Sequence, residues 1–183
     1  MPAFRLKTRR GRLDIAMATM ENISLAEDHD TQKDKYLTFR IGSEEYAIAI
    51  KNVTEIIGMM SITEVPQTPE YIKGVINLRG KVIPVMDIRL RFAMQARDYD
   101  ERTCVIVVRL KESTVGLVVD TVSEVLDIPE ENIEESSRLN SSDSNNFICA
   151  MGKVEDRIKM VIDVNALLFR DSEQLEQLCG EDN

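Results

Sequence analysis

Apolar and polar positions alternate where the chain first becomes well patterned. Leu37, Phe39 and Ile41 are separated by single polar or aromatic residues, and the segment 46–50 has the same spacing with alanines between its larger side chains. A period of two places one set of side chains on one face of an extended strand. Both segments are therefore predicted to be half-buried β-strands, and the apolar segment 53–57 offers a third strand.

Two more apolar runs lie close together in the segment 75–86, where Arg79-Gly80-Lys81 separates them. Short apolar runs on either side of a glycine turn indicate a β-hairpin. Its tip would carry two cations on a rigid and otherwise apolar scaffold. Pro84 has no amide donor, so its strand is expected to be an edge strand or a bulged one. Three residues are predicted to stabilise the turns: Asn77, Gly80 and Asp87.

The segment 68–74, which precedes this hairpin, has the residues of a single helical turn. Thr68 is a suitable N-cap, Pro69 suits the first helical position, and Gly74 could end the helix. Gly74 then has two possible roles. It is a helix terminator alone, or the sharp turn that it permits also contributes to a binding surface.

The body of the chain repeats itself. Shifting the segment 36–57 by 69 positions lays it on 105–126 with apolar positions coinciding almost throughout, and a shift of 76 lays 82–88 on 158–164. The seven extra positions fall within 134–146, which includes a serine-rich stretch of loop composition. Two copies without a third indicate a duplicated small domain rather than a solenoid.

Each copy would contain about five short strands, and a five-stranded sheet of this size can bury its interior only by curling into a barrel. The predicted fold is therefore mainly β, with two tandem five-stranded barrels, short helices and a C-terminal helix. The predicted organisation is a disordered tail (1–35), a first barrel (36–95), a second barrel (96–164) and a C-terminal helix and tail (165–183).

Charge and composition narrow the class of function. The formal net charge is −9, although the segment 1–19 is basic, so the rest of the chain is more acidic still. The acidic part of the chain would repel the negative charges of nucleic acid and of an anionic membrane, so neither is expected as a partner. Apolar runs long enough to span a membrane or to form a signal-peptide core are absent. The basic start also raises the possibility that Met20, rather than Met1, begins the native protein.

The sequence offers few residues that could serve in catalysis or bind a metal ion. The three cysteines are widely spaced, which indicates free thiols and a reducing cytoplasm. The sole histidine, His29, lies in a polar stretch of the expected tail, so the commonest general base and metal ligand is missing from the folded part. Phosphate-binding and nucleophile motifs are also absent. The sequence therefore predicts a protein that is not an enzyme and that has no cofactor or metal.

The segment 62–92, whose densest part reads YIKGVINLRGKVIPVMDIR, strongly resembles the CheW family of bacterial chemotaxis coupling proteins, and the resemblance extends over roughly 36–169. It implies a pair of SH3-like barrels. It also implies a cytoplasmic, non-enzymatic adaptor that couples the cytoplasmic tips of chemoreceptors to the histidine kinase CheA, whose regulatory domain is similar to CheW itself. Protein-binding faces would then be the functional sites.

Two sets of residues are candidates for those faces. Glu55 and Arg79 are predicted to pair, as opposite charges on adjacent strands of one small sheet, and to shape a binding surface. The alternatives are an outward-facing carboxylate and a solvated turn arginine. Val53, Val122 and Val125 could line a groove between the barrels that takes a receptor helix, or they could simply pack in the core.

Two other functions remain open from the sequence. One is a CheW-like adaptor of a signalling array that controls something other than swimming, since the scaffold chemistry would be the same. The other is a metabolite-binding β-barrel or small enzyme, which would need a concave pocket with converging polar groups.

Overall fold

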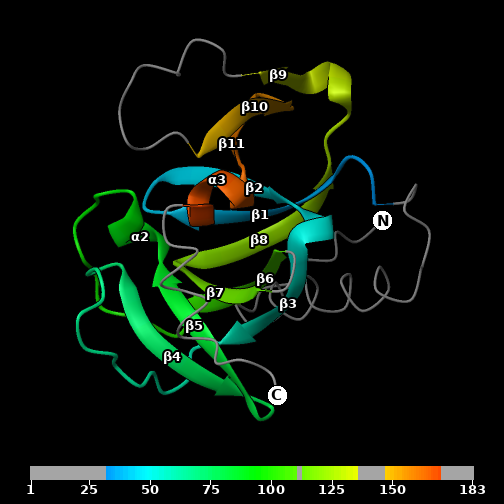
Figure 1. Ribbon diagram of the computed structural model, residues 1–183. Coiled ribbons are helices and arrows are strands. Elements are labelled where there is room, and N and C mark those ends of the chain that lie inside the picture. The colour runs from blue at the N-terminus through cyan, green and yellow to red at the C-terminus, as the bar shows by residue number, and fades with distance from the viewer. Residues whose placement is uncertain (1–31, 111–112, 136–146, 170–183) are drawn as a thin grey trace, which may run out of the picture.

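The computed structural model describes residues 32–110, 113–135 and 147–169, and their strands form two sheets (Figure 1). The six-stranded sheet has the order β8-β1-β2-β11-β10-β9 and the five-stranded sheet the order β3-β6-β7-β5-β4. The first consists of β1 (Lys35–Ile41), β2 (Glu44–Ala49), β8 (Thr121–Asp127), β9 (Ile133–Glu135), β10 (Ile148–Val154) and β11 (Arg157–Ile162). The second consists of β3 (Val53–Gly58), β4 (Ile72–Leu78), β5 (Lys81–Asp87), β6 (Cys104–Leu110) and β7 (Ser113–Val119).

The helices of the described residues are short. They are η1 (Ile50–Asn52), α2 (Ile88–Arg91), η2 (Glu130–Asn132) and α3 (Val164–Phe169). None of them is long and apolar enough to cross a membrane. The prediction of a mainly β fold with two barrel-like units and short helices is confirmed, although one of the sheets has six strands rather than five.

The alternation of apolar residues in β1 places Leu37, Phe39 and Ile41 in the core, where each is completely buried. Thr38, on the opposite face of the strand, is also buried at 1% exposure. Its hydroxyl donates a hydrogen bond to the Glu124 carbonyl oxygen at 2.8 Å, which satisfies the buried polar group. The burial of this second face is local, since Arg40, two residues further along the same face, is exposed.

The two sheets do not follow the two copies of the repeat. The chain leaves the six-stranded sheet after β2, builds β3 to β7 of the five-stranded sheet, and returns at β8. As a result, β1 of the first copy pairs with β8 of the second, and β3 of the first pairs with β6 of the second. The expected division at 95/96 therefore does not follow the sheets. A shift of 69 positions lays β1 on β6 and β3 on β8, so the first strand of each copy pairs with the third strand of the other.

A single large core joins the sheets. It contains residues of both, for example Phe39 of β1 and Leu117 of β7, and a smaller cluster around Val85 and Val105 lies within the five-stranded sheet. Fully burying a side chain of this size stabilises a fold by about 1.5–3 kcal/mol. Because both sheets contribute to the same cluster, neither can open without exposing the other.

Aromatic rings connect the end of α2 to the six-stranded sheet. Phe92 follows α2 and stacks on Phe147 with ring centroids 4.3 Å apart, and it also meets Tyr46 of β2 at 5.1 Å. The neighbouring Arg91 guanidinium lies over the Tyr71 ring, 5.0 Å from its centroid, and one of its terminal nitrogens donates to the Leu167 carbonyl oxygen at 3.3 Å. Elements of the five-stranded sheet are thus fastened to α3 and to the opposite sheet.

The segment 68–74 is not a helical turn, so this prediction is wrong. The Ile72 amide donates to the Pro69 carbonyl oxygen at 2.8 Å, which closes a tight turn, and β4 begins at Ile72. Pairing with β5, in register from Ile72 opposite Met86, competes successfully with the local helical preference. Gly74 consequently lies inside a strand and terminates no helix.

The strand of Pro84 is also placed differently from the prediction. β5 lies between β7 and β4 and is not an edge strand. Its parallel pairing with β7 begins only at Val85, opposite Gly116, so the missing amide of Pro84 falls just before that ladder. A proline is tolerated there because the ladder requires no donor from it.

The expected tails need adjusting where the structure describes them. β1 already begins at Lys35, and the Asp34 carbonyl oxygen accepts a hydrogen bond from the Ile128 amide at 2.8 Å, so the expected tail 1–35 is too long at its end. The terminal helix begins at Val164. The remaining parts of the expected tails, 1–31 and 170–183, and the serine-rich stretch 136–146 lie outside the described residues.

Candidate protein-binding site

The tip of the β4–β5 hairpin is a two-residue turn formed by Arg79 and Gly80, both with positive φ, 52° and 88°. Positive φ at both central residues matches the twist of the flanking strands and gives a tight connection. The Asn77 side chain accepts a hydrogen bond from the Gly80 amide at 2.8 Å. Val82, just beyond the tip, is 47% exposed. The hairpin therefore presents charged and apolar side chains on a turn whose backbone is held in one conformation.

Arg79 and Glu55 form a two-point ion pair, which confirms the predicted pairing. The two terminal guanidinium nitrogens donate to the two carboxylate oxygens at 3.1 and 2.9 Å. The Arg79 side chain remains 77% exposed, whereas Glu55 is 24% exposed. Two parallel hydrogen bonds fix the plane of the guanidinium, so a mobile surface side chain acquires a defined orientation.

The two residues do not lie on adjacent strands, contrary to the reason given for their pairing. Glu55 belongs to β3, at one end of the five-stranded order, and Arg79 follows β4, at the other end. The sheet curls so that its ends approach each other, as the isolated bridge between Thr63 and Val75 also shows. The ion pair thus closes the barrel as well as orienting the tip.

The three candidate groove valines differ in exposure. Val122 of β8 is 4% exposed and belongs to the main core, whereas Val53 of β3 and Val125 of β8 are half-buried and pack against that core. β3 and β8 are terminal strands in the orders of their sheets. Val53 and Val125 consequently offer some surface to a partner, whereas Val122 offers almost none.

Gly74 is a buried residue of β4 with φ of +133°, a conformation that other residues rarely adopt. A Cβ atom on Gly74 would lie 2.1 Å from the Thr63 carbonyl oxygen, far inside contact distance. Glycine is required here because the segment containing Thr63 runs directly against β4. Gly74 thus allows that segment to pack directly against β4.

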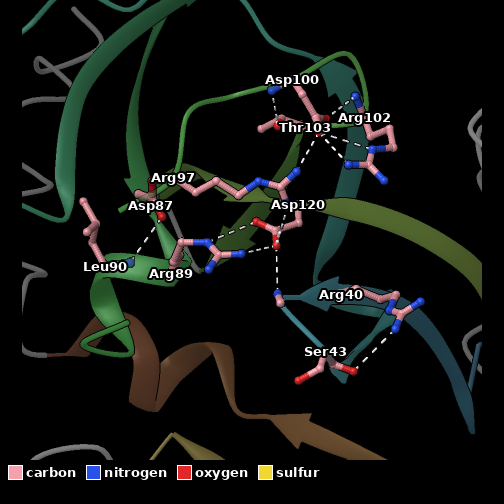
Figure 2. Close-up of polar contacts among 11 residues, drawn as sticks. Arg40, Ser43, Asp87, Arg89, Leu90, Arg97, Asp100, Arg102, Thr103 and Asp120 are labelled. Carbon is pink, nitrogen blue, oxygen red and sulfur yellow. Dashed lines mark hydrogen bonds and ion pairs between the residues drawn. The ribbon is translucent and has the colours of Figure 1, made fainter. Parts of the chain in front are cut away.

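A network of polar side chains beside α2 was missed by the sequence reasoning (Figure 2). Asp87 caps α2 by accepting from the Leu90 amide at 3.3 Å, and its other oxygen accepts from the Tyr99 hydroxyl at 2.8 Å. Burial, together with that hydrogen bond, raises the pKa of Tyr99. Next to them Arg89 forms an ion pair with Asp120. Its position directly after an apolar strand could have marked Asp120 as a candidate, but no sequence pattern indicated which residues it contacts.

The outer part of the network lies on the connection between α2 and β6. Arg97 contacts Asp100 at 2.8 Å and Asp120 at 3.6 Å. The hydrogen bond from the Arg102 side chain lowers the pKa of Asp100 to about 2. These charges satisfy one another, and among the described residues no group of histidine, cysteine or carboxylate side chains could hold a metal ion.

A second ion pair crosses the parallel pairing of β2 with β11. Lys159, whose side chain is 7% exposed, donates to the Glu45 carboxylate, and Arg157 approaches the same carboxylate at 3.8 Å. The hydrogen bond from Lys159 lowers the pKa of Glu45. A lysine buried to this extent needs such a partner.

Known proteins share the sequence pattern and the fold of this chain. The family described as "CheW-like domain" matches residues 35–172. A chemotaxis protein CheW from Klebsiella aerogenes is 38% identical over 139 residues, which cover 76% of this chain and 84% of the relative. Another from Bacillus subtilis is 34% identical over 141 residues, 77% of this chain and 90% of the relative.

Among solved structures, the scaffolding protein TtCheW from Thermoanaerobacter tengcongensis is similar with a TM-score of 0.69. It is 36% identical in sequence, and the match covers 74% of this chain and 92% of that protein. The family match runs from the start of β1 through the terminal helix. The chain therefore belongs to the family of CheW-like domains.

Proposed function

We propose that this protein is a cytoplasmic, non-enzymatic adaptor that couples the cytoplasmic tips of chemoreceptors to the regulatory domain of the histidine kinase CheA. Membership of the CheW-like family supports this class of function. The observation that carries the proposal is the orientation of Arg79, which is largely exposed and yet held at two points by Glu55. A preorganised cation binds a partner without first losing its conformational freedom.

An adaptor of this kind acts through geometry. It has to hold two partners in a fixed relation, and the core shared by the two sheets provides a rigid body for that purpose. The hairpin tip belongs to the five-stranded sheet alone, whereas the candidate groove draws on both sheets, with Val53 on β3 and Val125 on β8. The two candidate surfaces are therefore different, one for the kinase and one largely for the receptor.

Reversing the charge of Arg79 tests the hairpin tip. Arg79→Glu is expected to weaken kinase or receptor binding by about tenfold or more, as for a central interface arginine. The melting temperature should change by only a few degrees, because an exposed ion pair contributes about 0–1 kcal/mol. Titration calorimetry with purified partners and thermal unfolding measure the two effects.

Lys81→Glu is the matched control, because Lys81 is exposed beside the same tip and the substitution reverses the same charge. If Arg79→Glu leaves both complexes intact, the tip is an ordinary solvated turn. The double variant Glu55→Arg with Arg79→Glu tests the pair itself. Partial recovery of binding supports a direct role of the pair, and additive losses mean that the two residues meet partners independently.

The groove is tested at Val53. A receptor helix would lay apolar side chains against Val53 and Val125. Val53→Asp would place an unpaired carboxylate in that contact, which weakens binding strongly if the carboxylate is fully desolvated. Thr54→Asp is the control, since Thr54 is the next residue of β3 and is exposed. Receptor affinity that survives in a folded Val53→Asp protein places the groove elsewhere.

A further inference from the structure

The described chain passes between the two sheets at two places. The first crossing, from β2 to β3, uses the three residues of η1, and the second, from β7 to β8, uses Asp120 alone. A one-residue crossing can rotate about two backbone dihedrals unless something holds it. The side chain and backbone of Asp120 therefore lie where the relative orientation of the sheets is most directly controlled.

Asp120 is bound from both sides of this crossing. On the side of the six-stranded sheet, its carboxylate accepts from the Gly42 amide at 2.8 Å, and its own amide donates to the Arg40 carbonyl oxygen at 3.2 Å. On the side of the five-stranded sheet, the same carboxylate accepts from Arg89 of α2 through both the Nε atom, at 3.3 Å, and a terminal nitrogen. Figure 2 shows the carboxylate between these groups.

The central pair is well shielded from water. The side chains of Asp120 and Arg89 are 18% and 13% exposed, and Arg97 covers them from the connection that leads to β6. Charge-assisted hydrogen bonds in such surroundings are strong and directional. Apolar packing between the sheets is non-directional by comparison and does not by itself specify an angle.

The corresponding place in the other copy of the repeat lacks this arrangement. A shift of 69 positions puts Asp120 on Lys51 of η1, which is exposed. η1 has no side-chain hydrogen bond at its N-cap. The two crossings are thus unequal, with side-chain anchoring of the crossing concentrated at Asp120.

We propose that Asp120 is a positioning residue that sets the angle between the two sheets, and through it the angle between the receptor-binding and kinase-binding faces. The inference rests on the proposed adaptor function. It adds that kinase control depends on this carboxylate even though Asp120 contacts neither partner. Weakening the anchor should leave kinase binding at the hairpin tip intact, because that surface lies on one sheet. It should weaken receptor binding at the groove, because Val53 and Val125 lie on different sheets, and so misalign the ternary complex.

Asp120→Asn tests the inference because the amide keeps the size of the side chain and removes its charge. One spin label is attached at Lys81→Cys, at the tip of the β4–β5 hairpin, and the other at Asp156→Cys, at the tip of the β10–β11 hairpin of the other sheet. Pulsed electron paramagnetic resonance then measures the distance between the two labels. The background carries Cys149→Ser and Cys179→Ser, and Cys104 can stay because it is 2% exposed. The distance distribution should shift or broaden in Asp120→Asn.

The functional readout compares binary with ternary behaviour. The dissociation constant of the kinase complex should stay within about twofold of the wild-type value, as expected for sites that share no partners. The dissociation constant of the receptor complex should rise, and receptor-dependent kinase activity should fall by about tenfold, within the range of typical coupling between sites. A purely structural role would instead raise both dissociation constants to the same extent.

Asp127→Asn is the matched control. It removes the exposed ion pair with Lys35, which joins β8 to β1 within one sheet and does not cross between the sheets. An unchanged distance distribution in Asp120→Asn overturns the proposal, as do equal losses of affinity for the kinase and for the receptor. If Asp120→Asn does not fold, Arg89→Lys carries the same test, since it keeps the charge and loses the two-point contact.

The two arms of the experiment separate the two proposals. The spin-label distances need no partner, so they decide whether Asp120 sets the sheet angle even if the wild-type protein fails to activate a kinase. Failure of the wild-type protein in the ternary assay overturns the adaptor function and, with it, the functional half of this inference.

Discussion

Replacing Gly74 with alanine introduces a side chain where β4 meets the preceding segment. The new Cβ atom would lie 2.1 Å from the Thr63 carbonyl oxygen and 2.9 Å from the Glu64 Cα atom. Both are backbone atoms, so no side chain can rotate away to make room. The segment around Thr63 must therefore move away from β4.

Two costs follow from this movement. Alanine at φ of +133° is strained by about 1–3 kcal/mol. The displaced segment also loses two backbone hydrogen bonds, from the Thr63 amide to the Val75 oxygen at 2.8 Å and from the Val75 amide to the Thr63 oxygen at 2.9 Å. Each contributes about 1 kcal/mol net. The free energy of unfolding should fall by about 3–5 kcal/mol, which corresponds to a drop in melting temperature of roughly 10 °C.

Two other glycines provide controls for the separate costs. Gly80 has φ of +88° and open space around it, so Gly80→Ala should show backbone strain alone, about 1–2 kcal/mol. Gly58 has open space and no unusual φ, so Gly58→Ala should be close to neutral. Urea unfolding followed by circular dichroism gives the three free energies. The reasoning is refuted if Gly74→Ala costs no more than Gly80→Ala.

Three further predictions concern the pair of Lys159 with Glu45 and the cysteines. Lys159→Met should destabilise the protein by about 3 kcal/mol because it leaves the Glu45 carboxylate poorly compensated, and adding Glu45→Gln should recover most of the loss in urea unfolding. Because Lys159 lowers the pKa of Glu45, the stabilisation by this pair is present above the unfolded-state pKa and disappears as the pH falls through the lowered pKa. Glu45→Gln should therefore flatten the acid side of the curve of stability against pH. An unchanged curve would contradict this. Alkylation at mildly alkaline pH should modify Cys149 well before Cys104, because burial raises the pKa of the Cys104 thiol to about 11 and leaves it 2% exposed; equal rates in peptide mass mapping would contradict this order.

Local patterns predicted the local structure well. The alternation of Leu37, Phe39 and Ile41 gave a correct strand because side chains two residues apart share a face of any extended chain. The hairpin around Gly80 was also predicted correctly, since a glycine turn between apolar runs needs only neighbouring residues. The predicted helical turn at 68–74 failed for the complementary reason, because the pairing of β4 with β5 outweighed a weak local preference.

The sequence by itself predicted most of the strands of the first copy, the family, and the contact between Glu55 and Arg79, although not the strand order that brings these two residues together. Only the tertiary structure decided which strands share a sheet, because the two copies carry the same apolar pattern and pairing between copies buries it as well as pairing within one. It also decided the partners of Asp120. Hydrogen bonds need atoms within about 3 Å of one another, and the groups that meet this carboxylate come from the β1–β2 turn and from α2, which are far from it in the chain. Such contacts have no period and no spacing in the sequence, so they exist only once the two sheets have packed.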